Sequence, residues 1–308
     1  MTMRTHRGFT MVELMIGLIL TLAVGGVAYE MLLRSNRVTR AQGERIGVQD
    51  NVRSGALIIT NELREIGYDA ISAGASAAFG GYAPATRTDL LVIGSTGITY
   101  HATRALGFVC GVNTAAPARV ILGKNTWQEL RAPTTTDTLM LYVENAPNTS
   151  SDDAWVHLGI KGVGNENCPS GAAGLSLQVE APVGLTLTTA LNAVVLGGPA
   201  RVTEVMRMEH YVDATDGKPY LGMRSLTANE PNFQPVIGPL ATSGGAEPGL
   251  EFVFRRADNV TTAVLADVRA IELTLRGVTD QAVHGRRSYA TVDTLGLTTR
   301  VALRNTLR

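Results

Sequence analysis

Glu13 is the ionisable residue of this chain whose surroundings are least suited to a charge. It follows the run Gly8-Phe9-Thr10-Met11-Val12 and precedes a stretch, Leu14–Tyr29, that carries no charged residue. A carboxylate near the centre of a membrane helix costs about 2.5–3.5 kcal/mol on insertion scales. An opposite charge offsets that cost, because charges attract strongly where the dielectric constant is low. The sequence therefore predicts that Glu13 has a cationic partner.

The element that carries Glu13 is a predicted membrane-spanning helix over residues 9–33. Its length suits a hydrocarbon core of roughly 30 Å. Arg4, His6 and Arg7 precede it, and basic residues before a first span favour a cytoplasmic amino terminus. The rest of the chain is then expected outside the cytoplasm. The alternatives are a cleaved secretory signal and a plain uncleaved anchor. A plain anchor does not explain why an acidic residue lies in the membrane segment.

The segment Gly8–Glu13 and the apolar helix after it resemble the cleavage and methylation motif of type IV prepilins and type II secretion pseudopilins. The resemblance covers about residues 1–35. It implies that residues 1–8 are a leader, that a prepilin peptidase/methyltransferase cleaves after Gly8, and that Phe9 becomes an N-methylated amino terminus. Glu13 would then accept the Phe9 ammonium group of the next subunit, which would set the axial register between subunits.

A single long helix is predicted to continue past the membrane, because the chain has no proline before Pro84. Its amphipathic part is assigned to residues 34–70 and ends near Gly67, so the whole helix has about 55–60 residues and measures about 80–90 Å. Apolar residues recur there at the spacing of one buried helical stripe. The members of this stripe are Val38, Ala41, Val48, Val52, Ile59, Leu63 and Ile66.

The remainder, residues 71–308, is predicted to be an extracytoplasmic β-rich globular domain of one or two lobes. Short β-favouring runs alternate there with turn-forming residues. The expected strands are residues 89–93, 119–122, 138–143, 155–160, 175–179, 202–212, 220–225, 250–255, 268–275 and 298–303. The predicted fold class is α+β, with a long amino-terminal helix packed on a carboxy-terminal antiparallel β-rich domain, as in pilins.

The later half of the chain resembles PilW-like minor pilins and the J pseudopilin of type II secretion. The resemblance lies in the order of five segments: residues 207–213, 220–224, 249–254, 268–275 and 301–305. It implies a non-catalytic minor type IV pilin that takes part in pilus assembly or priming at or near the tip. The alternative is a J-like minor pseudopilin, which serves a periplasmic secretion filament.

The same resemblance implies partners and a location. The implied partners are the prepilin peptidase/methyltransferase, other minor and major pilins, the inner membrane and the assembly platform. The implied location is the inner membrane before assembly, with a cytoplasmic amino terminus, and the pilus at the cell surface afterwards.

The chain has two cysteines, Cys110 and Cys168. In an oxidising compartment a disulfide between them is the default expectation, and two unpaired buried thiols are the alternative. A metal site is not expected, because the sequence has no CxxC pair. Major pilins commonly close a loop near their carboxyl terminus with a cysteine pair, and no cysteine follows Cys168 here, which disfavours a major pilin.

The sequence offers little support for catalysis, since it contains neither HExxH nor G-x-S-x-G. Four of its histidines lie far apart along the chain: His101, His157, His210 and His284. We therefore expect no enzyme, no cofactor and no small-molecule substrate. The segment Asp213–Gly217 lacks the spacing of an EF-hand and is expected to be a hairpin turn rather than a calcium site.

The charge balance does not select a partner, because the formal net charge is zero. The arginines are scattered along the sequence, so a nucleic-acid partner would need a surface cluster of them, and the pattern does not favour one. The rivals from other functional classes are a pilus-associated adhesin or DNA-uptake subunit, whose β-domain binds a ligand directly, and an anchored periplasmic enzyme.

Overall fold

The computed structural model describes residues 10–66, 89–144, 153–245, 247–284 and 290–303. Gly8, Phe9 and the rest of the leader 1–8 lie outside the described residues. The chain divides into two compact units. One unit contains the chain up to Asp50 together with Val278–Leu295, and the other contains Asn51–Gly277 and the chain from Gly296 onward.

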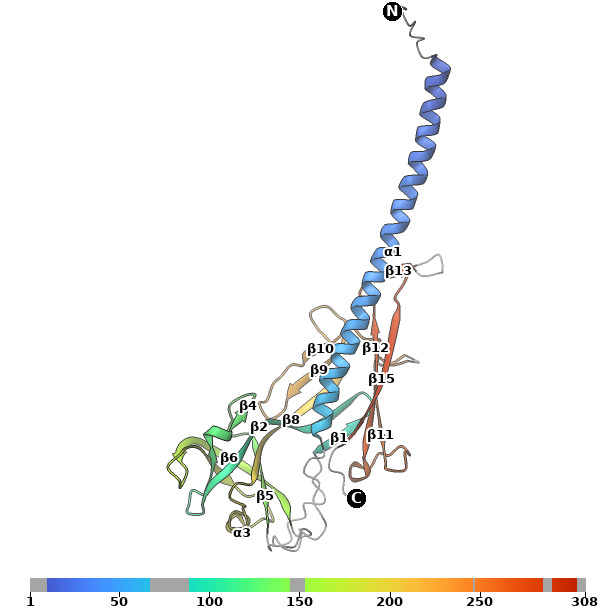
Figure 1. Cartoon of the computed structure of the whole chain (residues 1–308). Coiled ribbons are helices and arrows are strands. Elements are labelled where there is room, and N and C mark those ends of the chain that lie inside the picture. Colours follow the sequence, from blue (N-terminus) through green and yellow to red (C-terminus); the bar gives the residue numbers. More distant parts are fainter. Residues whose placement is uncertain (1–9, 67–88, 145–152, 246, 285–289, 304–308) are drawn as a thin grey trace, which may run out of the picture. The chain divides into compact units, whose positions relative to one another are not determined.

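The amino-terminal helix α1 spans Met11–Glu65 without interruption and has 55 residues (Figure 1). This confirms the predicted long helix, which ends at Glu65. Within the part of the chain that the structure describes, α1 is the one helix long and apolar enough to cross a membrane. The fold is α+β, as predicted, because an antiparallel β-rich domain follows this helix.

The last four turns of α1 bury one apolar stripe in the second unit. Its members, each at most 6% exposed, are Val52, Ala56, Ile59, Leu63 and Ile66. Their spacing of three and four residues places them on one face of the helix. The predicted stripe was wrong at Val38, whose side chain is 56% exposed, and Val48 is only half-buried. Both residues belong to the first unit, where Ala41, at 6% exposed, is a buried member of the predicted stripe.

The largest sheet has ten strands, and all of its paired neighbours run antiparallel (Figure 1). Its strands in chain order are β1 (Leu90–Gly94), β2 (Gly97–Asn113), β3 (Arg119–Gly123), β4 (Gln128–Glu129), β5 (Thr138–Val143), β6 (Ala154–Asn167), β7 (Ala173–Glu180), β8 (Pro199–Val212), β9 (Pro219–Ser225) and β10 (Gln234–Ile237).

Six of these strands close into a ring. The spatial order runs β2, β3, β7, β6, β5 and β8, and β8 pairs in turn with β2 from Gly97↔Glu209 to Phe108↔Pro199. A closed arrangement leaves no unpaired strand edge along the ring. All six strands contribute to one buried apolar cluster, which includes Val109, Val120, Leu141, Leu158, Leu177 and Val202. The outer strands β1, β9 and β10 extend the sheet beyond the ring.

A second sheet has three antiparallel strands in the order β11 (Leu250–Arg255), β12 (Ala270–Val278) and β15 (Thr294–Ala302). A short hairpin of β13 (Val283–His284) and β14 (Ala290–Thr291) lies between β12 and β15 in the sequence. Three short helices complete the described structure: η2 (Lys124–Thr126), α3 (Leu187–Asn192) and η3 (Leu265–Asp267). Each of the ten segments predicted as strands coincides with or overlaps an observed strand, whereas β2, β4, β10, β13 and β14 were not predicted.

Gly55 lies where α1 packs closely against β10. A Cβ atom on Gly55 would lie 2.0 Å from Cγ1 and Cδ1 of Ile237, whose side chain is buried. One turn earlier, the Asn51 side-chain amide donates a hydrogen bond to the backbone carbonyl of Gly238. A glycine at this position therefore serves close packing of the helix on the sheet.

We expect Gly55→Ala to lower the free energy of unfolding by about 1–2 kcal/mol. Displacing Ile237 costs about 1–3 kcal/mol, and the better helix propensity of alanine returns at most about 1 kcal/mol. The matched control is Gly47→Ala on the same helix, where an added Cβ would meet no atom within 4 Å. Urea unfolding of the detergent-solubilised chain, followed by tryptophan fluorescence, measures both variants. Equal stabilisation by the two substitutions would contradict the packing argument.

Cys110 in β2 and Cys168 after β6 are joined by a disulfide, with 5.5 Å between their Cα atoms. The two residues are separated by 58 positions in the sequence. The bond ties β2 to the turn between β6 and β7.

The double variant Cys110→Ser/Cys168→Ser is expected to unfold at lower denaturant concentration. In the chain-entropy treatment, a loop of this size contributes about 4 kcal/mol, and measured losses on removing a native disulfide are about 2–5 kcal/mol. The measurement is a urea midpoint with and without a thiol reductant. Reductant should shift the wild-type midpoint toward that of the variant and leave the variant unchanged.

Candidate functional site

The first turn of α1 places Glu13 next to a capping residue. The Glu13 backbone N–H donates to Oγ1 of Thr10 at 3.3 Å, directly before the helix begins at Met11. Thr10 and Glu13 thus occupy the N-cap and N3 positions, which is the spacing of a capping box. A negative charge in the first turn also complements the helix dipole. This cap was readable from the sequence but was not among the predicted features.

Glu13 is exposed, and within the residues that the structure describes no ion pair or hydrogen bond engages its carboxylate. The apolar side chains around it are also exposed on every side of the helix, for example Val12 at 65%, Leu14 at 64% and Ile16 at 53%. A helix that is apolar all round is stable when lipid or other helices surround it. The geometry leaves the Glu13 carboxylate available to a partner outside this chain.

One face of α1 combines Glu13 with small and hydroxyl-bearing residues. Gly17, Thr21 and Gly25 follow Glu13 at intervals of four residues. The Thr21 hydroxyl donates to the Gly17 carbonyl at 2.7 Å, so it is satisfied within the helix. Small residues on such a face allow another helix to approach closely. This face is suited to bringing a neighbouring helix within reach of Glu13.

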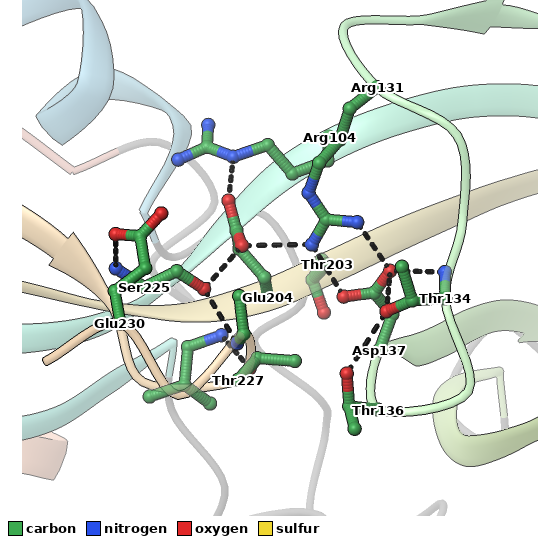
Figure 2. A network of polar contacts seen from close by, with 12 residues as sticks. Arg104, Arg131, Thr134, Thr136, Asp137, Thr203, Glu204, Ser225, Thr227 and Glu230 are labelled. Atoms are coloured by element: carbon green, nitrogen blue, oxygen red, sulfur yellow. Dashed lines mark hydrogen bonds and ion pairs between the residues drawn. The ribbon is translucent and has the colours of Figure 1, made fainter.

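A second cluster of charged groups lies inside the β-rich unit (Figure 2). Glu204 of β8 accepts hydrogen bonds from Arg104 of β2, from Arg131 Nη2 at 2.8 Å, and from Ser225 Oγ at 2.6 Å. Its side chain is 6% exposed. Arg131 also binds both carboxylate oxygens of Asp137, at 2.8 and 2.6 Å. The arginines are scattered along the sequence, but the fold brings two of them to one acid.

The network continues to the last turn of α1. Tyr100 Oη donates to Glu62 at 3.2 Å, and Arg104 Nη1 lies 3.6 Å from the other oxygen of Glu62. Thr134 donates its backbone N–H and its hydroxyl to Asp137, at 2.7 and 3.0 Å. The cluster thereby joins α1, β2, β8 and the segment before β5.

The protonation of this cluster follows from its contacts. Burial raises the pKa of Glu204, but the hydrogen bonds from Ser225 and the two arginines outweigh burial and hold its pKa below the ordinary value. Hydrogen bonding to Asp137 and Glu204 raises the pKa of Arg131. Burial, with help from the Glu62 carboxylate, raises the pKa of Tyr100 well above its usual range. Ionised acids and arginines that satisfy one another hold strands together rather than transfer protons.

The fold brings two of the four histidines together. His101 and His157 are distant in the sequence, but their ring centroids lie 5.9 Å apart with the rings nearly perpendicular. His210 is placed elsewhere, with Nε2 2.9 Å from the Ala241 carbonyl. In the described part of the chain, no group of three or more His, Cys, Asp and Glu side chains is arranged to hold a metal ion.

Residues 213–217 form the tight turn between β8 and β9. Asp213 N–H donates to the Lys218 carbonyl at 2.9 Å, and Gly217 N–H donates back to the Asp213 carbonyl at 2.9 Å. Gly217 has a φ of +70°, which suits glycine. The predicted hairpin at this position is confirmed.

Comparisons with known proteins concern the amino-terminal region. No curated protein and no solved structure matches the chain. Residues 3–29 match the prokaryotic N-terminal methylation motif, and this segment contains Gly8, Phe9 and Glu13. Together, the motif and the apolar first half of α1 fit an inner-membrane-anchored protein. The motif supports a type IV pilin-like or pseudopilin protein, processed by a prepilin peptidase and assembled with other pilins.

Proposed function

We propose that this chain is a minor type IV pilin, a non-catalytic subunit that takes part in pilus assembly or priming at or near the tip. The observation that carries the proposal is the methylation motif at residues 3–29, which runs directly into the unbroken 55-residue helix α1. The exposed apolar half of this helix belongs in a membrane or a filament core, and its last turns are buried against the β-rich domain. The PilW-like order of later segments supports the minor-pilin assignment.

The proposed mechanism starts with cleavage after Gly8 and methylation of Phe9. Cleavage on the cytoplasmic side leaves the apolar helix attached and places an ammonium group near the level of Glu13. The Glu13 carboxylate of one subunit then accepts the Phe9 ammonium group of a neighbour. The small-residue face with Gly17 and Thr21 supports this step, because it lets helices approach within ion-pairing distance.

The experiment that tests the function is intact-mass and amino-terminal analysis of the native protein from two fractions, the membrane and the sheared surface filaments. N-methylated Phe9 in the sheared fraction is the expected result. The same terminus confined to the cell envelope would replace the minor-pilin proposal with the J-like pseudopilin. Retention of Met1 in all fractions would overturn both, and would leave an anchored adhesin, DNA-uptake subunit or enzyme as the alternatives.

A further inference from the structure

The unit that contains the first part of α1 holds a cavity of about 610 Å³. Residues of α1 form one side of this cavity, and the segment before β13 forms the other. The lining includes Arg37, Arg40, Ala41, Glu44, Gln281 and Ala282. Ala41 is only 6% exposed, so the segment before β13 covers the helix surface at this level. The cavity is thus a built feature of this unit.

Polar contacts hold the covering segment on the helix. Arg45 Nε lies 2.6 Å from Oδ2 of Asp293 in an ion pair that joins positions 248 residues apart. The Asp293 backbone is itself fixed to Thr279, because Thr279 N–H donates to the Asp293 carbonyl at 3.0 Å and Asp293 N–H donates to Thr279 Oγ1 at 3.1 Å. Thr279 is 3% exposed. These contacts keep the cavity wall next to Arg37 and Arg40.

The lining carries more positive than negative charge, with two guanidinium groups and the single carboxylate of Glu44. Arg34, one turn closer to the apolar segment, is already paired with Glu30 at 2.5 Å. Among the described residues, no ion pair engages Arg37 or Arg40. Guanidinium groups bind phosphate oxygens in a bidentate geometry, so the two arginines form a cationic rim suited to a phosphate.

The depth of this rim matches a lipid headgroup. Arg37 and Arg40 follow Leu33, the last residue of the expected span, by about 6 and 10 Å along the helix axis. The headgroup layer on each side of a bilayer is roughly 5–8 Å thick, because a core of about 30 Å becomes about 40–45 Å with its headgroups. Arg37 therefore lies within the headgroup layer, and Arg40 lies just outside it, where its long side chain can reach back to the same phosphate.

We propose that this cavity binds the phosphodiester headgroup of an anionic phospholipid while the subunit is in the membrane. The inference rests on the proposed membrane-anchored state of the chain and adds a ligand site to it. Arg37 and Arg40 contact the phosphate, and the covering segment at Gln281 lines the other side of the headgroup. Binding would hold the subunit at a defined depth until it leaves the bilayer.

Native mass spectrometry of the full chain tests this site. The protein is purified in a neutral detergent, mixed with equal amounts of phosphatidylglycerol and phosphatidylcholine, and the lipids retained per chain are counted. We expect about a tenfold preference for phosphatidylglycerol, since each arginine near an anionic headgroup adds appreciably to the attraction. Arg37→Gln/Arg40→Gln should abolish the preference, and Arg37→Lys/Arg40→Lys should retain part of it. The matched control is Arg53→Gln, an exposed arginine on the same helix outside the cavity, which should keep the wild-type preference.

Equal retention of the two lipids by the wild type would overturn the proposal, and so would an unchanged preference in the double glutamine variant. Full competition by inorganic phosphate would also overturn it, because the cavity would then be a site for free phosphate. Alkaline extraction of cell membranes, done in parallel, distinguishes failure of the lipid-site proposal from failure of the proposed function. A chain that resists extraction but shows no lipid preference loses only the lipid site. A chain that extracts into the supernatant loses the membrane anchor as well.

Discussion

A Glu13→Val protein is expected to be cleaved after Gly8 like the wild type but to reach sheared filaments at less than about a tenth of the wild-type level. The free-energy difference needed for a tenfold loss is only about 1.4 kcal/mol. An ammonium group left without its carboxylate in a low-dielectric layer costs more than that. Valine suits the membrane helix at least as well as glutamate, so anchoring in the bilayer should not suffer.

The measurement is the ratio of the variant in the filament fraction to the variant in the membrane fraction, determined by quantitative mass spectrometry. Glu13→Ala should behave in the same way. Glu30→Gln is the matched control. Glu30 is an exposed acid on the same helix, but it follows the apolar run Leu14–Tyr29 and pairs with Arg34. Normal incorporation of Glu13→Val would remove Glu13 from the proposed register mechanism.

Glu204→Ala is expected to lower the free energy of unfolding of the β-rich domain by about 3–5 kcal/mol, the usual cost of removing one partner from a buried ion pair. The loss is large because Arg104, at 12% side-chain exposure, would keep a buried charge without its main acceptor. Arg131 and Ser225 would each lose one hydrogen bond as well. Urea unfolding of the detergent-solubilised chain, followed by circular dichroism, measures the change.

The control for this prediction lies on the same strand. Glu209 pairs with Arg207 at 2.6 Å, but the two side chains are 29% and 42% exposed. A pair of this kind contributes about 0–1 kcal/mol, so Glu209→Gln should change stability little. Similar losses for Glu204→Ala and Glu209→Gln would show that burial of the network does not matter.

The pH dependence of stability provides a second test of Glu204. Its pKa in the folded chain lies below the ordinary value of 4.5. A carboxyl group with a lowered folded pKa contributes stability above its unfolded pKa and loses that contribution as the pH falls through the folded value. Wild-type stability should therefore drop below about pH 4.5, and Glu204→Gln should show a smaller drop. Burial and the nearby Glu62 raise the pKa of Glu65 in the folded chain. The contribution of Glu65 to stability therefore increases as the pH falls, opposite to that of Glu204.

Local sequence patterns were sufficient for α1 and for most strands. The predicted bounds of β5 and β11 agree with the structure because both are short β-favouring runs with turn residues on either side. The prediction missed β2, which contains Gly97, Gly107 and Gly111 together with His101 and Arg104. These residues weaken a local strand signal, and β2 is held instead by β1, β3, β4 and β8, which pair with different parts of its length.

The candidate site was predictable only where its residues are neighbours in the sequence. Glu13 stood out because a single acid interrupts an apolar run, whereas Arg104, Arg131 and Glu204 look like ordinary surface charges when taken one at a time. Their association depends on the register between β2 and β8, which places Glu204 opposite Ala102. Register between strands so distant in the sequence results from packing of the whole domain, so no local pattern could indicate it.

The ring closure also has a consequence for the newly made chain. During synthesis β2 emerges from the ribosome well before β8, the strand that covers one of its edges. Until then β2 presents unpaired backbone groups, which are a template for pairing with other chains. Contacts between distant segments also form slowly. The edge of β2 that β8 covers therefore stays open to pairing with other chains until β8 has been made.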